Sequence, residues 1–290
     1  MKAEILFPSQ CILGEGPIWH AQRQCCFWVD IEKGILFEYN WLNKNTRSRN
    51  FDYKLSLVIQ GRNNHLILAL NGGIARFDLD SENLEWLLDI ETKIAAHRCN
   101  DGSCDSYGRL WLGTMHKHFK RGAGSLYCVD TNLTIKKKLD KVTISNGIVW
   151  SLDGKRLYYI DSPTQAVQSF FFNEETGDII FEKNTIQIPG SMGTPDGMTI
   201  DEEGMLWIAH WGGFGVYRWN PLDGKILDKI DIPVPNVTSC TFAGPNLDHL
   251  VITTARESLK KEDLKRYPES GNTFVTKTQV KGILTNICLI

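Results

Sequence analysis

The sequence contains no apolar run near the roughly 20 residues that a membrane-spanning helix needs, and its formal net charge is only -2. A chain with so little net charge has no electrostatic reason to bind nucleic acid or an anionic membrane, so neither is expected as a partner. The N-terminal stretch 1–8 is too short in apolar residues, and too soon broken by Pro8, to be a signal peptide. These absences predict a cytoplasmic protein.

Several well-known catalytic motifs are also missing. The chain has no Gly-x-Ser-x-Gly elbow and no phosphate-binding glycine loop, which argues against a serine hydrolase or a nucleotide-dependent enzyme. None of the seven histidines forms a pair with the spacing of a zinc-binding helix, so a histidine-based metal site is not expected. His97 and His210 are placed where they could reach a cavity, but ordinary packing is the favoured interpretation of both.

The eight cysteines do not form a recognisable framework. There is no Cys-x-x-Cys pair, and the adjacent Cys25 and Cys26 would point to opposite faces of a strand. Scattered cysteines in a chain long enough to bury a large core are typical of buried thiols in a reducing compartment. We therefore expect no disulfide bonds.

What the sequence does contain is a repeat: a short apolar run, a polar turn and a second strand-like run, six times over. Six apolar anchors are spaced by 40, 43, 48, 48 and 44 residues; they are Trp28, Leu68, Trp111, Tyr159, Trp207 and Val251. Periods of about 40–50 residues made of several short strands are typical of a β-propeller. The sequence therefore predicts an all-β fold, a single six-bladed β-propeller domain over residues 1–290. A β-sandwich is the alternative, because sandwiches also have short strands and frequent turns.

Two further expectations follow from the propeller. The apolar runs, such as 66–70 and 207–209, should be the strands that line the central channel, with the preceding turns at its mouth. The N-terminal strand 4–7 should pair into the blade formed by the C-terminus, because ring closure removes an exposed edge. Helical patterning is weak everywhere except at 259–265.

Four polar turns stand before strand-like runs and would meet at one mouth of the channel. They carry Glu15, Asn100, Asn146 and Asp196, each beside a glycine or in a turn that contains one. Carboxylate and amide oxygens are hard donors, suited to Ca²⁺, Mg²⁺, Mn²⁺ or Zn²⁺. Asp and Asn beside Gly are also ordinary turn formers, so each of them alone is explained by the turn. Glu15 has no such turn preference, and its place between two glycines favours a role in a single metal site.

The same stretches resemble the SMP-30/gluconolactonase/LRE family, and the resemblance covers nearly the whole chain in the same order. The stretches that carry it are 14–17, 98–102, 113–115, 144–147, 159–162, 195–198 and 237–242. The resemblance implies a six-bladed propeller with one catalytic divalent metal ion, whose identity (Ca²⁺, Zn²⁺, Mn²⁺, Mg²⁺ or Fe²⁺) stays open. It also implies a sugar lactonase, a carboxylic ester hydrolase that opens an aldonolactone such as gluconolactone to its acid.

By position in the family's motifs, the resemblance implies a role for each residue. Glu15, Asn146 and Asp196 would be the metal ligands, and Asp196 would also be the catalytic general base. Arg98, Asn100 and Asp101 would contact the substrate. A structural salt bridge is the alternative for Arg98.

One departure from the family concerns the loop at 116–122. Many relatives carry an acidic residue there, whereas this loop contains Lys117, Lys120 and Arg121. A cationic lid could favour a substrate with an anionic group, and a solvated loop without substrate contact is the plainer alternative.

Two alternative functions remain open at this point. A non-catalytic Ca²⁺-binding regulatory protein, similar to regucalcin, needs the same ligands but no turnover. A protein-interaction propeller of the WD40 kind is less supported, because Gly-His and Trp-Asp repeat signals are absent. The expected partner is a small-molecule sugar lactone, with the protein a monomer or a weak homo-oligomer.

Overall fold

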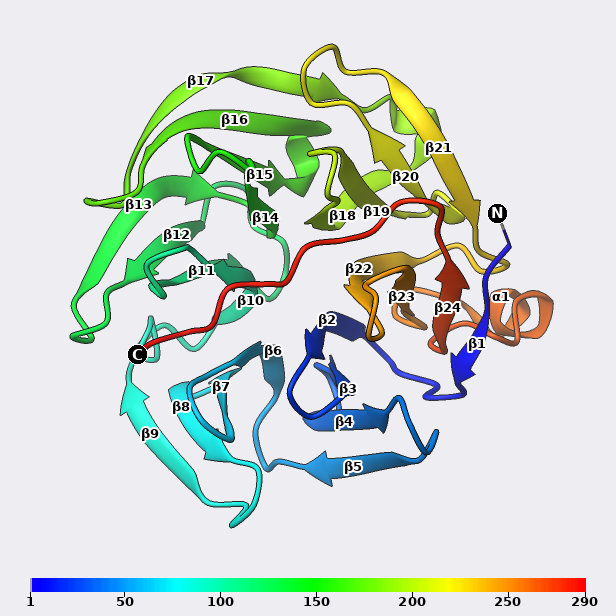
Figure 1. Ribbon diagram of the computed structural model, residues 1–290, viewed down its shortest axis with the longest axis horizontal. Coiled ribbons are helices and arrows are strands. Elements are labelled where there is room, and N and C mark those ends of the chain that lie inside the picture. The colour runs from blue at the N-terminus through cyan, green and yellow to red at the C-terminus, as the bar shows by residue number, and fades with distance from the viewer. Residues whose placement is uncertain (1) are drawn as a thin grey trace.

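The computed structural model describes residues 2–290, whose strands form a six-bladed β-propeller (Figure 1). Every blade is a four-stranded antiparallel sheet, and the six sheets are arranged as a ring around a central channel. The predicted fold class is confirmed. None of the helices in the described part of the chain is long and apolar enough to cross a membrane.

Five blades are built from four strands that follow one another in the chain, from the innermost strand outward. The first blade contains β2 (Gly14–His20), β3 (Cys25–Asp30), β4 (Ile35–Asn40) and β5 (Thr46–Asn50). The second contains β6 (Leu55–Gln60), β7 (His65–Leu70), β8 (Gly73–Asp78) and β9 (Leu84–Leu88). The third contains β10 (His97–Cys104), β11 (Leu110–His116), β12 (Gly124–Val129) and β13 (Ile135–Val142).

The remaining blades follow the same order, with one exception. The fourth contains β14 (Ser145–Trp150), β15 (Arg156–Asp161), β16 (Ala166–Asn173) and β17 (Asp178–Gln187). The fifth contains β18 (Thr194–Ile200), β19 (Leu206–Trp211), β20 (Gly215–Trp219) and β21 (Ile226–Asp231). The sixth takes its outer strand from the N-terminus and contains β22 (Val237–Ala243), β23 (His249–Thr254), β24 (Thr273–Lys277) and β1 (Glu4–Phe7). Within residues 2–290, three short helices lie in connections: η1 (Ser162–Thr164), η2 (Gly190–Met192) and α1 (Lys261–Arg266).

The ring closes as the sequence predicted. Strand β1 pairs antiparallel with β24, with Ile5 opposite Phe274, so both ends of the described chain contribute to one blade. The pairing covers an edge that would otherwise present free backbone donors and acceptors. The expected helical turn at 259–265 is also found, as α1.

The expected order of strands within a blade is wrong in one respect. The apolar runs predicted to line the channel, such as those of Trp28 and Trp207, are the second strands of their blades. The channel is lined instead by β2, β6, β10, β14, β18 and β22, which include the stretches taken for turns. The apolar runs are buried because each lies between the first and third strands of its blade. The innermost strands present polar side chains to the channel.

Buried tryptophans anchor the second strands through a repeated contact with an aspartate. Asp105 Oδ2 accepts a hydrogen bond from Trp111 Nε1 at 2.9 Å, and Asp201 Oδ2 accepts one from Trp207 Nε1 at 2.9 Å. The other oxygen of Asp201 accepts backbone N–H groups of Glu203 and Met205, closing the turn between β18 and β19. This aspartate therefore ties the innermost strand of the fifth blade to its neighbour.

Replacing Asp201 with alanine should destabilise the protein by about 3 kcal/mol, because it leaves a buried indole N–H and two backbone donors without acceptors. Asp201 is 0% exposed and also pairs with Arg218 at 2.8 Å, so water cannot easily replace the lost carboxylate. The midpoint of thermal unfolding should fall by roughly 5 °C, because a chain of this length has a large entropy of unfolding. Asp228→Ala, on an exposed position of the same blade, is the matched control and should shift the midpoint very little.

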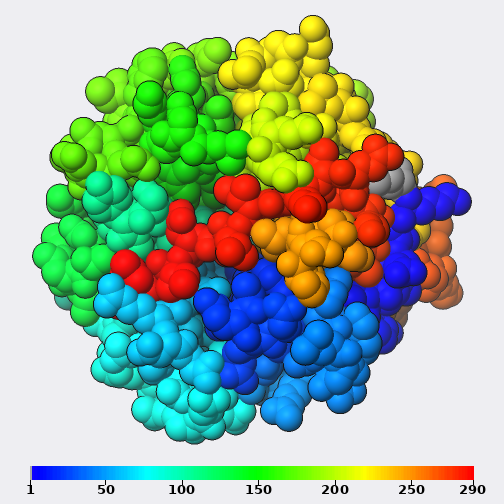
Figure 2. All heavy atoms as spheres, viewed as in Figure 1, coloured from blue at the N-terminus to red at the C-terminus, as the bar shows by residue number. Residues whose placement is uncertain are grey.

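The C-terminal segment crosses the centre of one face of the propeller, as Figure 2 shows in red. Gly282 forms a β-bridge with Asp201, and the backbone N–H groups of Cys288 and Leu289 donate to Gln60 and Gly108 at 2.8 and 2.9 Å. These contacts lie beyond the C-terminal ends of the innermost strands. The segment therefore covers the channel on that face and leaves the opposite mouth for the candidate site.

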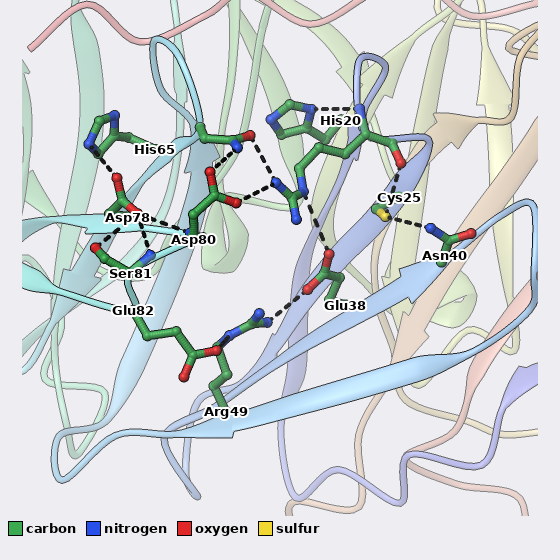
Figure 3. A network of polar contacts seen from close by, with 12 residues as sticks. His20, Cys25, Glu38, Asn40, Arg49, His65, Asp78, Asp80, Ser81 and Glu82 are labelled. Carbon is green, nitrogen blue, oxygen red and sulfur yellow. Dashed lines mark hydrogen bonds and ion pairs between the residues drawn. The ribbon is translucent and has the colours of Figure 1, made fainter.

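A polar seam joins the outer strands of the first two blades (Figure 3). Arg49 donates to Glu38 of its own blade at 2.8 Å and to Glu82 of the second blade at 2.7 Å, and His65 pairs with Asp78 within the second blade at 3.2 Å. His20, which is part of this region, is the last residue of β2. Glu15 lies near the start of β2, so the seam is at the other end of that strand. The seam holds the two blades together.

All eight cysteines are free and buried, so the predicted absence of disulfide bonds is confirmed.

Candidate metal centre and its pocket

A pocket of about 230 Å³ opens at the mouth of the channel opposite the C-terminal segment. Its polar floor comes from the innermost strands of four different blades: Glu15, Arg98, Asn100, Asn146 and Asp196. Residues separated by up to 181 positions in the sequence are thus brought together by ring closure alone. The structure places five of the six residues singled out in the sequence around one cavity.

Each polar floor residue lies within or beside an irregularity of its strand, and not in a turn as the sequence suggested. The pairing register shifts between Glu15 and Ile18, between Asn146 and Ile148, and between Pro195 and Met198. A β-bulge inserts an unpaired residue and re-aims the side chains around it. The innermost strands are therefore bent at the same level, and their polar side chains converge on the mouth of the channel.

The backbone at these strands explains why glycines stand next to Glu15 and Asp196. Gly16 adopts φ +50°, a left-handed conformation that L side chains rarely take. Gly197 follows Asp196 and packs against the sixth blade so closely that an added Cβ would lie 2.2 Å from Ser239 Oγ. The Asp-Gly and Glu-Gly pairs of the sequence therefore permit the bulge and the close approach of neighbouring blades.

The floor holds two carboxyl groups that have no cationic partner close enough to keep them ionised. Burial, with a contribution from the negative charge of Asp101, raises the pKa of Glu15 to about 8. Burial and the nearby Glu15 raise the pKa of Asp196 well above its ordinary value. Arg98 is the one cation of the floor. Its charge lowers the pKa of both carboxyl groups, but by less than burial and the acidic neighbours raise it. In the described part of the chain, neither carboxylate has an ion-pair partner.

This donor set fits a divalent cation. The Asp196 carboxylate is 6% exposed, yet it accepts no hydrogen bond from any described residue, and Glu15 accepts only one, at 3.2 Å from the N–H of Gly16. Buried carboxylates without donors are costly unless a cation compensates them. Two carboxylates and an amide oxygen are hard ligands of the kind that Ca²⁺, Mg²⁺ and Mn²⁺ accept. No described residues form a group of three or more His, Cys, Asp or Glu suited to a metal, so this mixed set is the candidate.

Arg98 is held toward the floor by Asn100. Its Nη1 donates to Asn100 Oδ1 at 2.5 Å and to the Cys99 carbonyl at 3.0 Å. No described carboxylate forms an ion pair with it, so the structural salt bridge considered for Arg98 is absent. Burial lowers the pKa of its guanidinium, opposed by the surrounding glutamates, of which Glu257 contributes most. The guanidinium keeps unused N–H donors that can face a bound molecule.

Asp101 lies beside this pocket but not in its lining. It lines a separate cavity of about 80 Å³ lower in the channel, together with Gly16, Ser239 and Thr285 of the C-terminal segment. Its carboxylate accepts the N–H of Gly102 at 2.7 Å, and burial raises its pKa to about 6. A direct substrate contact by Asp101 is therefore not favoured by its position, whereas its charge acts on Glu15 and Asp196.

Sequence reasoning gave no role to five residues of the pocket: Phe119, Ser162, Trp211, Glu257 and Ser258. Ser162 lies within the family-like stretch 159–162, but the resemblance implies no role for it. Glu257 follows the second strand of the sixth blade, at the position where the other blades turn toward the mouth, which is the only signal that could have found it. Burial raises the pKa of Glu257, partly offset by the charge of Arg98, and its carboxyl is the third acidic group that lines the pocket.

The basic loop contributes one aromatic residue to the pocket and no cation. Phe119 lines the pocket, whereas Lys117 donates to the backbone carbonyl of Ala95 at 2.6 Å. Lys120 and Arg121 are not among the residues of the lining. The geometry therefore favours a solvated loop over a cationic lid.

Neither of the two candidate histidines lines the pocket. His97 Nδ1 contacts Glu91 Oε2 at 2.8 Å, and His210 stacks on Tyr217 with ring centroids 4.2 Å apart. Burial lowers the pKa of His210 to about 4. Both are explained by packing.

Comparison with known proteins finds relatives that match along almost the whole chain. Residues 13–256 match the family model described as the SMP-30/Gluconolactonase/LRE-like region. A protein of uncharacterised function from Sulfolobus acidocaldarius is 38% identical over 283 residues, covering 98% of both chains. The putative sugar lactone lactonase YvrE of Bacillus subtilis is 32% identical, covering 97% of both chains. The solved structure of regucalcin, a calcium-binding protein from Agrobacterium tumefaciens, matches with a TM-score of 0.95 at 26% identity, over 100% of this chain and 99% of the other.

Proposed function

Since the chain belongs to the SMP-30/gluconolactonase/LRE-like family, we propose that it is a metal-dependent hydrolase that opens a sugar lactone to its aldonic acid. The observation that carries the proposal is the pair of buried carboxylates, Glu15 and Asp196, that lack any cationic or hydrogen-bonding compensation adequate to their burial. Such a pair at the floor of a small-molecule pocket is suited to hold a divalent ion beside a substrate.

Glu15, Asn146 and Asp196 are the proposed ligands, one from each of three innermost strands. When bound, a divalent ion at this position supplies Lewis-acid polarisation of the lactone carbonyl and lowers the pKa of a water molecule. Its identity is left open among Ca²⁺, Zn²⁺, Mn²⁺, Mg²⁺ and Fe²⁺, because the donor set suits several of them.

The residues of the chain then have separate tasks in the hydrolysis. Asp196 accepts the proton of the attacking water as the general base. Arg98, positioned by Asn100, directs its free N–H groups toward the oxygen on which negative charge develops as the carbonyl is attacked. Collapse of the tetrahedral intermediate breaks the bond to the ring oxygen, which takes up the proton and becomes a hydroxyl of the aldonic acid. The apolar rim formed by Leu13, Phe119 and Trp211 shields the site from bulk water.

The proposal is tested on protein stripped of metal and then supplied with Ca²⁺, Zn²⁺, Mn²⁺, Mg²⁺ or Fe²⁺ in turn. Hydrolysis of glucono-, galactono-, arabinono- and xylonolactone is followed by acid release in a weakly buffered indicator assay. We expect turnover of at least one lactone that disappears with the metal and returns with it. Turnover that is indifferent to the metal would contradict the mechanism.

A non-catalytic calcium-binding protein is the second candidate. The observation in its favour is the near-complete structural match to regucalcin from Agrobacterium tumefaciens, which is described as a calcium-binding protein. The same experiment separates the two, because a binding protein takes up Ca²⁺ without hydrolysing any lactone of the panel.

Replacing Phe119 with alanine should raise KM for the lactone about threefold to tenfold and leave kcat nearly unchanged. The ring is 56% exposed at the rim of the pocket, so it can cover the ground state and the transition state of the substrate alike. Leu133→Ala is the matched control, since Leu133 is an exposed apolar residue of the same blade, 37% exposed and also with positive φ. A fall in kcat without a change in KM would place Phe119 in the chemical step instead.

A further inference from the structure

A directed series of hydrogen bonds runs across the pocket floor and links three blades. Arg98 donates to Asn100 Oδ1, and Asn100 Nδ2 donates to Asn146 Oδ1 at 2.8 Å. Asn146 Nδ2 donates in turn to Ser162 Oγ at 2.7 Å, and Ser162 Oγ donates to the Pro195 carbonyl at 2.7 Å. The series begins beside the proposed substrate and ends at the peptide that carries Asp196.

Ser162 is the member of this series that the function described so far does not use. It begins helix η1 between β15 and β16 of the fourth blade, is 3% exposed and lines the pocket. A hydroxyl has one proton to donate, and the Pro195 carbonyl can only accept, so that proton is committed to Pro195. A lone pair of Ser162 Oγ therefore faces Asn146 and requires a donor there.

This requirement fixes which way the Asn146 amide points. With Nδ2 on Ser162, Oδ1 faces the Nδ2 donor of Asn100. In the reversed amide, Asn146 Oδ1 would face the lone pair of Ser162 Oγ, and Asn146 Nδ2 would face the Nδ2 donor of Asn100. An amide oxygen has two lone pairs, and only one is used by Asn100, so the second is available to a cation.

The same hydroxyl also contacts β18, the strand that contains Asp196. The Pro195 carbonyl belongs to the peptide bond that leads into Asp196, next to the register shift of β18. Beside the hydrogen bond that Gln165 Nε2 donates to Thr194 Oγ1 at 3.3 Å, Ser162 supplies a buried polar contact from the fourth blade to the fifth. Its hydroxyl thus touches both the side chain of one proposed ligand and the backbone of another.

We propose that Ser162 is a positioning residue of the metal centre, whose hydroxyl orients the Asn146 carbonyl and sets the distance between Asn146 and Asp196. The inference rests on the proposed metal site and adds a residue to it. Groups that hold metal ligands in place commonly change metal affinity by about 10–100-fold when they are lost. Ser162 does not touch the substrate in this account.

The test compares Ser162→Ala with wild type by calorimetric titration of metal-free protein with Ca²⁺ and with Mn²⁺, alongside thermal unfolding without metal. We expect the Kd of Ser162→Ala for both ions to rise about 10–100-fold. The unfolding midpoint of the metal-free variant should stay close to that of the metal-free wild type. Thr164→Ala is the matched control: Thr164 lies in the same helix, and its hydroxyl donates to the Asp161 carbonyl at 2.7 Å, away from the ligands. It should bind both ions as the wild type does.

A second pair of variants keeps the test valid if Ser162→Ala folds poorly. The Thr and Val side chains have the same shape, and only Thr has a hydroxyl. The Ser162→Thr variant should therefore bind the ions at least tenfold more tightly than Ser162→Val. Equal affinities within this pair, or a wild-type Kd for Ser162→Ala, would overturn the inference while leaving the metal site intact. A wild-type protein that binds none of Ca²⁺, Mn²⁺, Mg²⁺, Zn²⁺ and Fe²⁺ in the same titration would overturn the proposed function and this inference together.

Discussion

Replacing Asp196 with asparagine is expected to lower kcat for lactone hydrolysis by about 10³-fold, because an amide cannot accept the proton of the attacking water. Asparagine keeps the size of the side chain and an oxygen that can still contact a cation. The Asp196 side chain is buried and accepts no hydrogen bond from the described residues, so the substitution removes the acid–base group without breaking a structural contact. The fold should be retained.

The role of Asp196 as base is separated from its role as ligand by measuring kcat at increasing metal concentration. If Asp196 is the base, kcat of Asp196→Asn stays low even when calorimetry shows the site to be saturated. If saturation restores kcat, Asp196 is only a ligand and the base lies elsewhere. Asp223→Asn, an exposed carboxylate in the loop between β20 and β21, is the control and should behave as wild type.

Replacing Glu15 with glutamine should have opposite effects with and without metal. In metal-free protein the pKa of Glu15 is raised to about 8, above its ordinary value of 4.5, chiefly by burial. Between these two pH values the folded protein holds a proton that the unfolded chain has released, so the free energy of unfolding falls as pH rises. Glutamine carries no such proton. Metal-free Glu15→Gln should therefore match wild type at pH 5 and be more stable at pH 8, by roughly 1–3 kcal/mol.

Adding metal should reverse the order. A ligand that binds only the folded protein stabilises it by about 2.7 kcal/mol at a concentration 100 times its Kd. Wild type should gain this at pH 8, whereas Glu15→Gln should gain little because it has lost a charged ligand. The measurement is thermal unfolding at pH 5 and pH 8, with and without Ca²⁺. Destabilisation of metal-free Glu15→Gln at pH 8 would show that the Glu15 charge has a compensating partner and would remove the main argument for a cation.

The blades could be predicted from the sequence because their second and third strands follow apolar patterns. Trp28, Trp111 and Trp207 are fully buried between blades, and their regular spacing reports the repeat directly. The innermost strands could not be recognised, since channel-facing strands need polar residues and their bulges interrupt the alternation. Gly14–His20 and Thr194–Ile200 therefore looked like turns although each forms a strand.

The candidate site was predicted in its residues and not in its contacts. Glu15 stood out because a glutamate between two glycines has no local structural reason, and Asp196 because it shared the same pattern. Glu257 and Phe119 did not, since loop residues reach the pocket only through tertiary placement. The role of Ser162 depends on two 2.7 Å hydrogen bonds, to Asn146 and to the Pro195 carbonyl, that no sequence pattern encodes.

The most direct test of the central claim, that residues from three innermost strands hold one divalent cation, is anomalous X-ray scattering from crystals grown with Mn²⁺. The account predicts a single strong anomalous peak at the pocket floor, bonded to side-chain oxygens of Glu15, Asn146 and Asp196. A floor without a peak at saturating Mn²⁺, or a peak held by other residues, would contradict it.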